Sequence, residues 1–202
     1  MGSVNILSRF SETSFAESAP DSSFDIDNFC QKRSDRTKAS NKSRGGGTCL
    51  YVNEKWCHPN NVHVKQQLCT PDLEMLIVVL RPFYPPREFT KVTVVVYVHS
   101  KANTIAAMST VTNHVHEQQS QSPDGVLLVT RDFNAASLKD YLLNYQQYVD
   151  MPTRRNKTLD LCYGNAPGAY KTKRLPELGN SDHCMVSLLP KYRPKLKTLK
   201  VH

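Results

Sequence analysis

Short apolar runs separated by polar segments dominate the chain, and most of these runs are rich in β-branched residues. They cover residues 48–52, 73–80, 91–98, 126–130 and 184–189. Continuous Val and Leu runs of this length are typical of strands that are buried on both faces, and β-branched side chains favour strands. The pattern therefore predicts five strands of a buried β-sheet.

Between the third and fourth of these runs, apolar residues recur at helical spacing. They are Ile105, Met108, Val111 and Val115. This period predicts a helix over residues 104–119 that lies on the sheet. A second helix is predicted to begin at Ser137, with Asp140 as its capping-box partner. Its apolar face would consist of Leu138, Tyr141, Leu142 and Tyr145. Strands that alternate with helices predict an α/β fold.

Two polar clusters lie at the ends of predicted strands. The run 126–130 leads directly into Arg131-Asp-Phe-Asn134, and Asn180-Ser-Asp-His183 leads directly into the run 184–189. Loops at strand ends are places where a rigid sheet can hold acids, amides and imidazoles together. Taken singly, the first cluster could be an Asx turn and the second an ordinary loop. In this order, the two together indicate a metal-assisted phosphodiesterase.

The composition points to one domain with a polyanionic partner. The chain has 202 residues and a net charge of +8, with a pI of about 9.2. This length suits a single sizeable core, and the positive charge favours association with nucleic acid. A basic surface with no such role remains the alternative reading of the charge.

The cysteine pattern and the hydropathy bound the cellular setting. Six cysteines occur with no Cys-x-x-Cys pair, which argues against a zinc site. No run approaches the roughly 18 apolar residues of a membrane span, and no apolar segment follows a basic start. We therefore expect a nuclear or cytoplasmic protein that is not secreted and does not bind membranes.

Composition shifts suggest three segments. Residues 1–44, rich first in Ser and acids and then in Lys and Arg, are expected to form a partly ordered N-terminal segment. Residues 45–190 are expected to form the domain, and residues 191–202 a basic tail. This tail reads either as a solvated end or as a binding element, because Lys and Arg accumulate there without any acid.

The two polar clusters match the chemical needs of phosphodiester hydrolysis. The reaction must neutralise charge on the phosphoryl oxygens, deprotonate a water molecule and stabilise a leaving alkoxide. Carboxylates that bind Mg²⁺ supply the first of these, and an Asp or His can supply the second. Magnesium usually takes only one or two protein carboxylates, so a few acids on separate loops suit this metal.

The sequence resembles the endonuclease/exonuclease/phosphatase superfamily, and most closely the endonuclease domain of fish-type non-LTR retrotransposons (LINEs). The resemblance runs from about residue 10 to residue 197. Its main carriers are Phe10-Ser-Glu12-Thr-Ser-Phe15, Arg81-Pro-Phe-Tyr-Pro-Pro-Arg-Glu-Phe89, Arg131-Asp-Phe-Asn134, Pro152-Thr-Arg154, Lys157-Thr-Leu-Asp160 and Ser181-Asp-His183. It implies a four-layer α/β sandwich of two mainly antiparallel β-sheets flanked by helices, a Mg²⁺ or Mn²⁺ cofactor, and cleavage of a nucleic-acid backbone.

The same resemblance implies roles for individual metal-site and phosphate-site residues. Glu12 and Asp182 match metal-binding acids, and the less favoured reading of Glu12 is a surface acid in a polar loop. Tyr97 matches a tyrosine that hydrogen-bonds the scissile phosphate, whereas a Tyr in an apolar strand usually belongs to the core. Asp132 matches the acid that orients or deprotonates the attacking water, and Asn134 matches the amide that holds this acid and the phosphate.

The last pair of matched residues completes the implied catalytic group. Asp160 resembles the carboxylate that fixes the tautomer of a catalytic imidazole, and His183 is that imidazole. The expected nucleic-acid contacts are basic residues near these motifs. They are Arg131, Arg154, Lys191 and Arg193.

The chain also departs from the family pattern. A first strand that brings an asparagine to the metal has no counterpart, because Glu12 is preceded by only eleven residues. Arg131 replaces a glycine, and we expect this cation to block the site or to lower the pKa of Asp132. His99 and Ser100 replace two prolines. Together these departures indicate a decaying copy of a mobile element's enzyme.

Two functions are consistent with these residues. The first is an Mg²⁺-dependent endonuclease that nicks DNA. The second is a catalytically impaired remnant that binds nucleic acid non-specifically through its basic surface. A phosphoinositide or sphingolipid substrate is disfavoured, because the matches are to the retrotransposon type. No stable protein partner is predicted.

Overall fold

A computed structural model of the chain describes residues 6–7, 25–41, 47–83 and 91–191. Its strands are β1 (Ile6–Leu7), β2 (Phe29–Ser34), β3 (Thr48–Asn53), β4 (Val62–Cys69), β5 (Leu73–Leu80), β6 (Lys91–Val98), β7 (Val126–Asp132), β8 (Gln146–Gln147), β9 (Asp160–Gly164), β10 (Tyr170–Glu177) and β11 (Cys184–Pro190). The helices of this part of the chain are α1 (Thr104–Gln121) and the short 3₁₀ helices η2 (Lys38–Ser40) and η3 (Pro59–Asn61).

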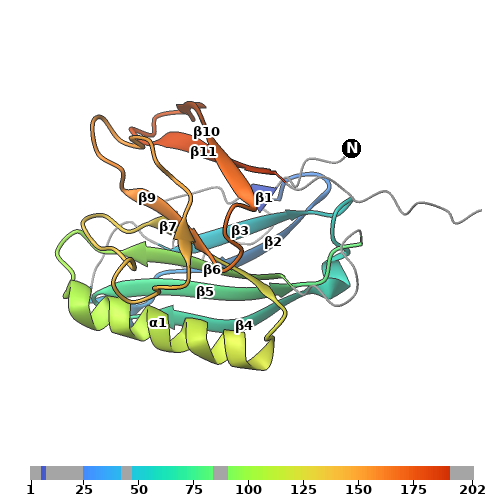
Figure 1. Cartoon of the computed structure of the whole chain (residues 1–202), viewed down its shortest axis with the longest axis horizontal. Helices are drawn as coiled ribbons and strands as arrows, with labels where there is room; N and C mark the ends of the chain where they lie inside the picture. Colours follow the sequence, from blue (N-terminus) through green and yellow to red (C-terminus); the bar gives the residue numbers. More distant parts are fainter. Residues whose placement is uncertain (1–5, 8–24, 42–46, 84–90, 192–202) are drawn as a thin grey trace, which may run out of the picture.

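The largest unit is a six-stranded mixed sheet with the order β4-β5-β6-β7-β9-β8. Its neighbouring strands run antiparallel except β6 and β7, which are parallel. Parallel neighbours need a long crossover, and α1 provides it between β6 and β7. Figure 1 shows this helix lying along one face of the sheet.

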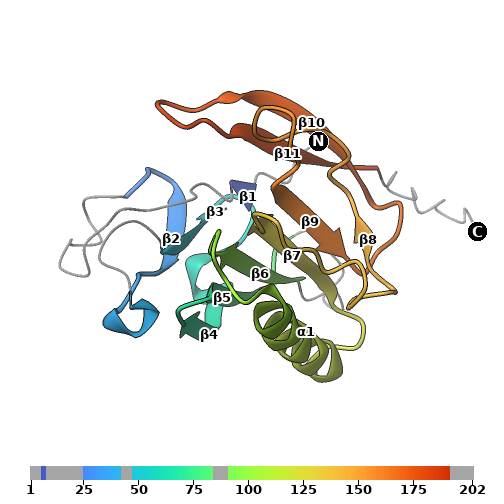
Figure 2. The ribbon, with the colours of Figure 1, turned by 90° about the vertical axis from the view of Figure 1, so that its left-hand side faces the viewer.

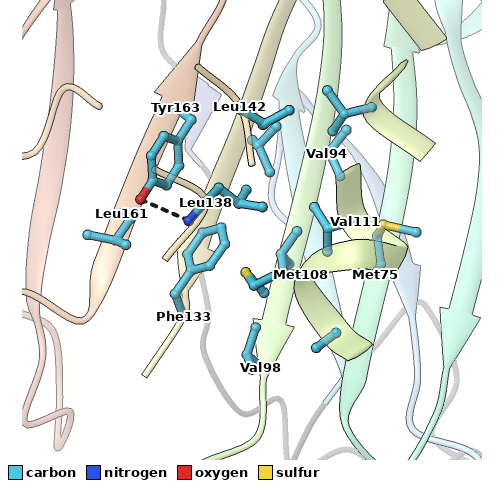
Figure 3. Packing of buried hydrophobic residues seen from close by; sticks show 14 of the residues in the cluster. Met75, Val94, Val98, Met108, Val111, Phe133, Leu138, Leu142, Leu161 and Tyr163 are labelled. Atoms are coloured by element: carbon cyan, nitrogen blue, oxygen red, sulfur yellow. Dashed lines mark hydrogen bonds between the residues drawn. The ribbon is translucent and has the colours of Figure 1, made fainter. Parts of the chain in front are cut away.

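The helix-covered face of the sheet carries the main hydrophobic core. Met108 and Val111 of α1 pack with Met75 of β5 and Val94 of β6, and all four side chains are buried. Figure 3 shows Phe133, Leu138 and Leu142 continuing this core beyond β7. The residues that follow β7 are therefore anchored by apolar packing, which fixes the position of the polar groups beside them.

On the opposite face of the six-stranded sheet lie two smaller sheets. One is three-stranded, with the order β1-β3-β2, and the other is the antiparallel pair β10-β11. Leu50 and Val52 of β3 pack against Leu76 and Val78 of β5 in a second buried cluster. Figure 2 shows β10 and β11 across from β7 and β9, on the side away from α1. The expected α/β sandwich of mainly antiparallel sheets is confirmed.

Most predicted elements are present. The five predicted strands correspond to β3, β5, β6, β7 and β11, and the first predicted helix corresponds to α1. Within the described ranges, no helix combines the length and the hydropathy needed to cross a membrane.

The predicted second helix is wrong. Residues 137–145 form consecutive turns, in which the Leu138 amide donates to the Tyr163 hydroxyl at 3.2 Å (Figure 3). The Ser137 hydroxyl contacts the same phenol oxygen at 3.0 Å. The Tyr163 hydroxyl of β9 thus holds the start of this segment, and Leu138 and Leu142 are buried without a helix. Tertiary contacts outweigh the helical spacing of the apolar residues.

This packing predicts a strong asymmetry between two leucines of the turn segment. Leu138 is fully buried, whereas Leu143 is 83% exposed. Leu138→Ala should lower the free energy of unfolding by about 2–5 kcal/mol, because it leaves a cavity in the main core. Leu143→Ala, the matched control, should change it by less than about 0.5 kcal/mol. Urea denaturation followed by circular dichroism measures both, and equal losses would contradict this packing.

Candidate functional site

The candidate site lies where β6 and β7 end and β5 and β9 begin. This end of the inner strands of the six-stranded sheet is called the sheet edge. Asp132 is the last residue of β7 and Asp160 the first of β9, and their Cα atoms are direct partners in the antiparallel register. Directly opposed residues of antiparallel strands have Cβ atoms about 4.5–5.5 Å apart. The sheet register therefore brings together two acids that are 28 residues apart in the sequence.

Asp160 and His183 form the shortest carboxylate–imidazole contact of the site. His183 Nδ1 lies 2.7 Å from Asp160 Oδ2. The hydrogen bond to Asp160 raises the pKa of His183 above its usual value, although partial burial opposes this effect. Burial alone would raise the pKa of Asp160, but the hydrogen bond and the charge of His183, helped by Arg131 and Thr153, hold it below the usual range. The pair is thus an aspartate that orients a readily protonated imidazole.

Thr153 connects the chain segments that carry this pair. Its hydroxyl oxygen accepts the backbone N–H groups of Leu159 and Asp160, each at 3.0 Å. Its carbonyl accepts the N–H of Cys184 at 2.8 Å, directly after His183. Thr153 is fully buried. A single threonine therefore fixes the backbone of both the aspartate and the histidine.

Asp132 is held by the turn that follows it. The Asn134 backbone N–H donates to Asp132 Oδ1 at 2.8 Å, and the Asn134 side-chain amide donates to the Val98 carbonyl of β6 at 2.7 Å. Asn134 has φ +49°, a conformation that Asn tolerates better than most residues. Burial raises the pKa of Asp132 above its ordinary value, and the negative charge of Asp160 adds to this rise. Of the two opposed acids, Asp132 is therefore the one that binds a proton more readily, since the pKa of Asp160 is lowered.

Arg131 occupies a strained position within the acid cluster. Its φ is +120°, in a region that favours glycine. Its Nη2 atom is buried, and burial lowers the pKa of the guanidinium while the charges of Asp160 and Asp132 raise it. The charge of Arg131 does act to lower the pKa of Asp132, as expected, but burial of Asp132 outweighs this effect and the pKa is raised.

Asp182 is paired with Arg154. Its Oδ2 accepts from Arg154 Nε at 2.7 Å and lies 2.5 Å from Arg154 Nη2, and its side chain is 55% exposed. The hydrogen bond from Arg154 lowers the pKa of Asp182. Asp182 Oδ1 is 4.0 Å from His183 Nε2. Asp182 is thus an ionised acid at the rim of the site, and its charge is balanced by Arg154.

The remaining predicted residues fall in different places. Tyr97 lies at the end of β6, next to Val98, and so at the same sheet edge as Asp132. Lys191 is exposed and directly follows β11, whereas His183 directly precedes this strand. At about 3.3 Å per residue, the two residues are roughly 25 Å apart. Glu12 and Arg193 lie outside the described residues.

Among the residues that the structure describes, no group of three or more His, Cys, Asp or Glu side chains could hold a metal ion. Asp160 is engaged by His183 and Asp182 by Arg154. The described residues therefore do not form a metal site by themselves.

Sequence reasoning did not identify three residues that form a second charged cluster at this edge. Glu74 of β5 is 1% exposed, Arg36 binds it through Nε at 2.5 Å, and His99 Nε2 lies 3.7 Å from the same carboxylate oxygen. One signal was available, because Glu74 is the only charged residue in the apolar run 73–80. A charge in such a strand must be paired when it is buried.

Comparison with known proteins identifies the fold. No protein-family model matches the sequence, and no curated protein matches it either. The human Nocturnin catalytic domain with bound sulfate anion is similar in structure over 80% of this chain and 72% of that chain, with a TM-score of 0.54 and 14% identity. A humanized D. rerio TDP2 with 14 mutations covers 80% of this chain and 75% of its own, with a TM-score of 0.52 and 11% identity.

A protein of the endonuclease/exonuclease/phosphatase family from Bacteroides thetaiotaomicron is also similar, over 78% of this chain and 74% of that chain, with a TM-score of 0.47 and 9% identity. The chain thus shares its fold with the Nocturnin catalytic domain and with TDP2. At these identities the similarity concerns the fold alone, so the chemistry must be argued from the site.

The strain at Arg131 can be measured separately from its charge. Arg131→Gly and Arg131→Ala both remove the guanidinium, but only glycine adopts φ +120° without strain. The glycine variant should be the more stable of the two by about 1 kcal/mol in urea denaturation.

Ala107→Gly in α1 is the control for the Arg131 variants, because glycine there should lower the free energy of unfolding by about 1 kcal/mol. An Arg131→Gly protein less stable than Arg131→Ala would show that the backbone is not strained at this residue.

The raised pKa of Asp132 predicts a pH-dependent effect on stability. Ionisation of a carboxyl whose pKa is higher in the folded than in the unfolded state costs stability, and the cost begins above the ordinary value of 3.8. Asp132→Asn removes this cost and can keep the hydrogen bond from the Asn134 amide. We expect the variant to be more stable than the parent by about 1 kcal/mol at pH 7 and equally stable near pH 3.

Thermal unfolding across this pH range tests the expectation for Asp132→Asn. The advantage of the variant should grow from about pH 4 upward and become constant once the folded-state carboxyl is ionised. The control is Asp150→Asn, at an exposed acid. A variant that is less stable than the parent at pH 7 would contradict the role of burial.

Proposed function

We propose that this chain hydrolyses phosphodiester bonds in nucleic acid, as a DNA-nicking endonuclease domain of the retrotransposon type. The observation that carries the proposal is the meeting of Asp132, Asp160 and His183 at one sheet edge, with His183 Nδ1 at 2.7 Å from Asp160. Hydrolysis needs one group that accepts a proton from water and one that carries positive charge. One acid has a raised pKa, and one imidazole is paired with an ionised acid.

In this proposal Asp132 accepts the proton of the attacking water. A general base works best when its pKa approaches the working pH, and burial moves the pKa of Asp132 in that direction. The Asn134 backbone N–H keeps one oxygen of the carboxyl in place at 2.8 Å. A fixed orientation lowers the entropic cost of bringing water and base together.

His183 supplies positive charge to the phosphoryl group. Its Nδ1 is directed at Asp160, so its Nε2 is the nitrogen that remains for a phosphate oxygen. The raised pKa of His183 favours the imidazolium form, which can stabilise the charge that develops on the phosphate. Asp160 thus acts through His183 by fixing its ring and its tautomer.

The basic charge of the chain supports a nucleic-acid substrate. Arg155 and Lys157 are exposed on the turn that precedes Asp160, and Lys171 and Lys173 are exposed on β10. Lys and Arg that neutralise phosphates bind polynucleotides in a salt-dependent manner. The similar Nocturnin structure contains a sulfate anion, which supports an oxyanion ligand for this fold.

A divalent cation, Mg²⁺ or Mn²⁺, is proposed as the cofactor, with Glu12 and Asp182 as its protein ligands. When bound, such an ion polarises a phosphoryl oxygen as a Lewis acid. Because Arg154 holds Asp182 Oδ2, the ion would bind through Oδ1 or displace the guanidinium.

Two observations favour a second candidate, an impaired remnant that binds nucleic acid without cleaving it. Arg131 holds a strained φ of +120° beside both catalytic acids, and Asp182 is already paired with Arg154. A remnant of this kind would bind DNA with a steep dependence on salt and with no dependence on Mg²⁺.

A plasmid-nicking assay separates the two candidates. Supercoiled plasmid is incubated with the protein in Mg²⁺, in Mn²⁺ and in EDTA. Metal-dependent conversion to open circles is expected, and Asp132→Asn and His183→Ala should each reduce the rate by about 10²–10⁴-fold. Arg155→Ala, at an exposed turn residue, should mainly weaken DNA binding.

Salt-dependent binding without cleavage, by a protein that circular dichroism shows to be folded, would reject the endonuclease in favour of the remnant. If Arg131→Gly then restores nicking, the loss of activity in the parent chain is due to that one residue.

A further inference from the structure

Glu74 is a buried carboxylate at the same sheet edge as the candidate site. It is the second residue of β5, and its side chain is 2% exposed. An isolated buried charge is far too costly for a fold of marginal stability. Its partners must therefore be arranged around it, and their arrangement indicates what the charge does.

The partners of Glu74 come from both sides of the sandwich. Arg36, which follows β2, donates from Nε to Glu74 Oε1 at 2.5 Å. The backbone N–H of Gly47, which precedes β3, donates to the other oxygen. His99, just after β6, has Nε2 at 3.7 Å from Oε1, and its Nδ1 lies 3.4 Å from Arg36 Nη2. Glu74 and its partners thus connect the three-stranded sheet to the six-stranded sheet. The side chains of Arg36, Glu74 and His99 are together called the clamp.

Arg36 and His99 also contact the ring of Tyr97. Tyr97 is the register partner of Glu74 across β5 and β6. The His99 ring meets the Tyr97 ring edge-on, with centroids 5.0 Å apart and an interplanar angle of 87°. The Arg36 guanidinium carbon lies 6.0 Å from the centroid of the Tyr97 ring. Contacts of both kinds are attractive at these separations, so the ring is held by two members of the clamp.

Val98, which follows Tyr97, is connected to Asp132 by hydrogen bonds through Asn134. The Val98 carbonyl accepts from the Asn134 side chain at 2.7 Å, and the Asn134 backbone N–H donates to Asp132 at 2.8 Å. Continuous contacts therefore run from Glu74 through Tyr97 and Asn134 to Asp132.

We propose that Arg36, Glu74 and His99 are positioning residues, which fix the Tyr97 phenol relative to Asp132 for the reaction at the sheet edge. The inference rests on the proposed phosphodiesterase function for its catalytic consequence. The placement of the ring by the clamp is independent of that function. The two claims can therefore fail separately.

The matched variants are Arg36→Lys and Asp35→Asn. Lysine keeps the positive charge but loses the planar fork that contacts both Glu74 and the Tyr97 ring. Asp35 pairs with Arg33 at 3.0 Å on the adjoining segment and provides a control ion pair that is not part of the clamp. Glu74→Gln, which keeps the shape of the side chain and removes its charge, is the second test variant.

The first readout is kinetic and uses a double-mutant cycle. Arg36→Lys should lower kcat for plasmid nicking about tenfold and change KM less than twofold, because a misplaced group affects the transition state most. In a Tyr97→Phe background the same substitution should have little further effect. An equal loss in both backgrounds would show that the clamp does not act through Tyr97 and would overturn the proposal.

The second readout does not need activity. In protein labelled with 3-fluorotyrosine, the ¹⁹F resonance of Tyr97 is assigned by its loss in Tyr97→Phe. It should shift in Arg36→Lys and in Glu74→Gln and stay unchanged in Asp35→Asn. An unshifted resonance in Arg36→Lys overturns the proposal whether or not the parent chain nicks DNA. If the chain is inactive and the resonance shifts, the positioning role holds and the proposed function fails.

Discussion

The antiparallel pairing of β7 with β9 is the constraint on which the rest of the site depends. It sets Asp132 opposite Asp160, and it directs Asp160 toward His183, which directly precedes β11. Two like charges in a partly buried place repel each other, so their proton affinities separate. Asp160 stays ionised because His183 pairs with it, and Asp132 takes the raised pKa. The division of roles between the acids thus follows from which of them has the imidazole.

The fold holds this arrangement from two sides. On the helix side, Phe133 and Leu138 anchor the segment after β7 in the main core. On the other side, Thr153 fixes the backbone of Asp160 and of Cys184, next to His183. Glu74 adds a charged connection between the sheets at the same edge. Buried polar groups of this kind contribute more to a unique geometry than to net stability, and geometry is what a reaction at a phosphate requires.

The apolar strands and α1 could be predicted from the sequence because their hydrophobic periods are long and regular. Strands β4 and β10 were missed because their residues are mostly polar. Both are outermost strands of their sheets, where no apolar run is needed. The false helix after Ser137 shows the converse, since contacts with Tyr163 and with the main core outweigh the helical spacing of the apolar residues. In the site, Asp132 and His183 could be predicted because they belong to polar clusters at the ends of apolar runs. The partnership of Arg154 with Asp182 could not be predicted, because it depends on how two loops meet.

Convergence of Asp160 and His183 is tested most directly by the titration of the His183 imidazole in NMR spectra, in the parent chain and in Asp160→Asn. A salt-bridged His183 should titrate above the ordinary value of 6.5 in the parent chain, and its pKa should fall in the variant. Identical titration of His183 in the two proteins would mean that the carboxylate and the imidazole do not meet. That result would contradict the site and, with it, the proposed chemistry.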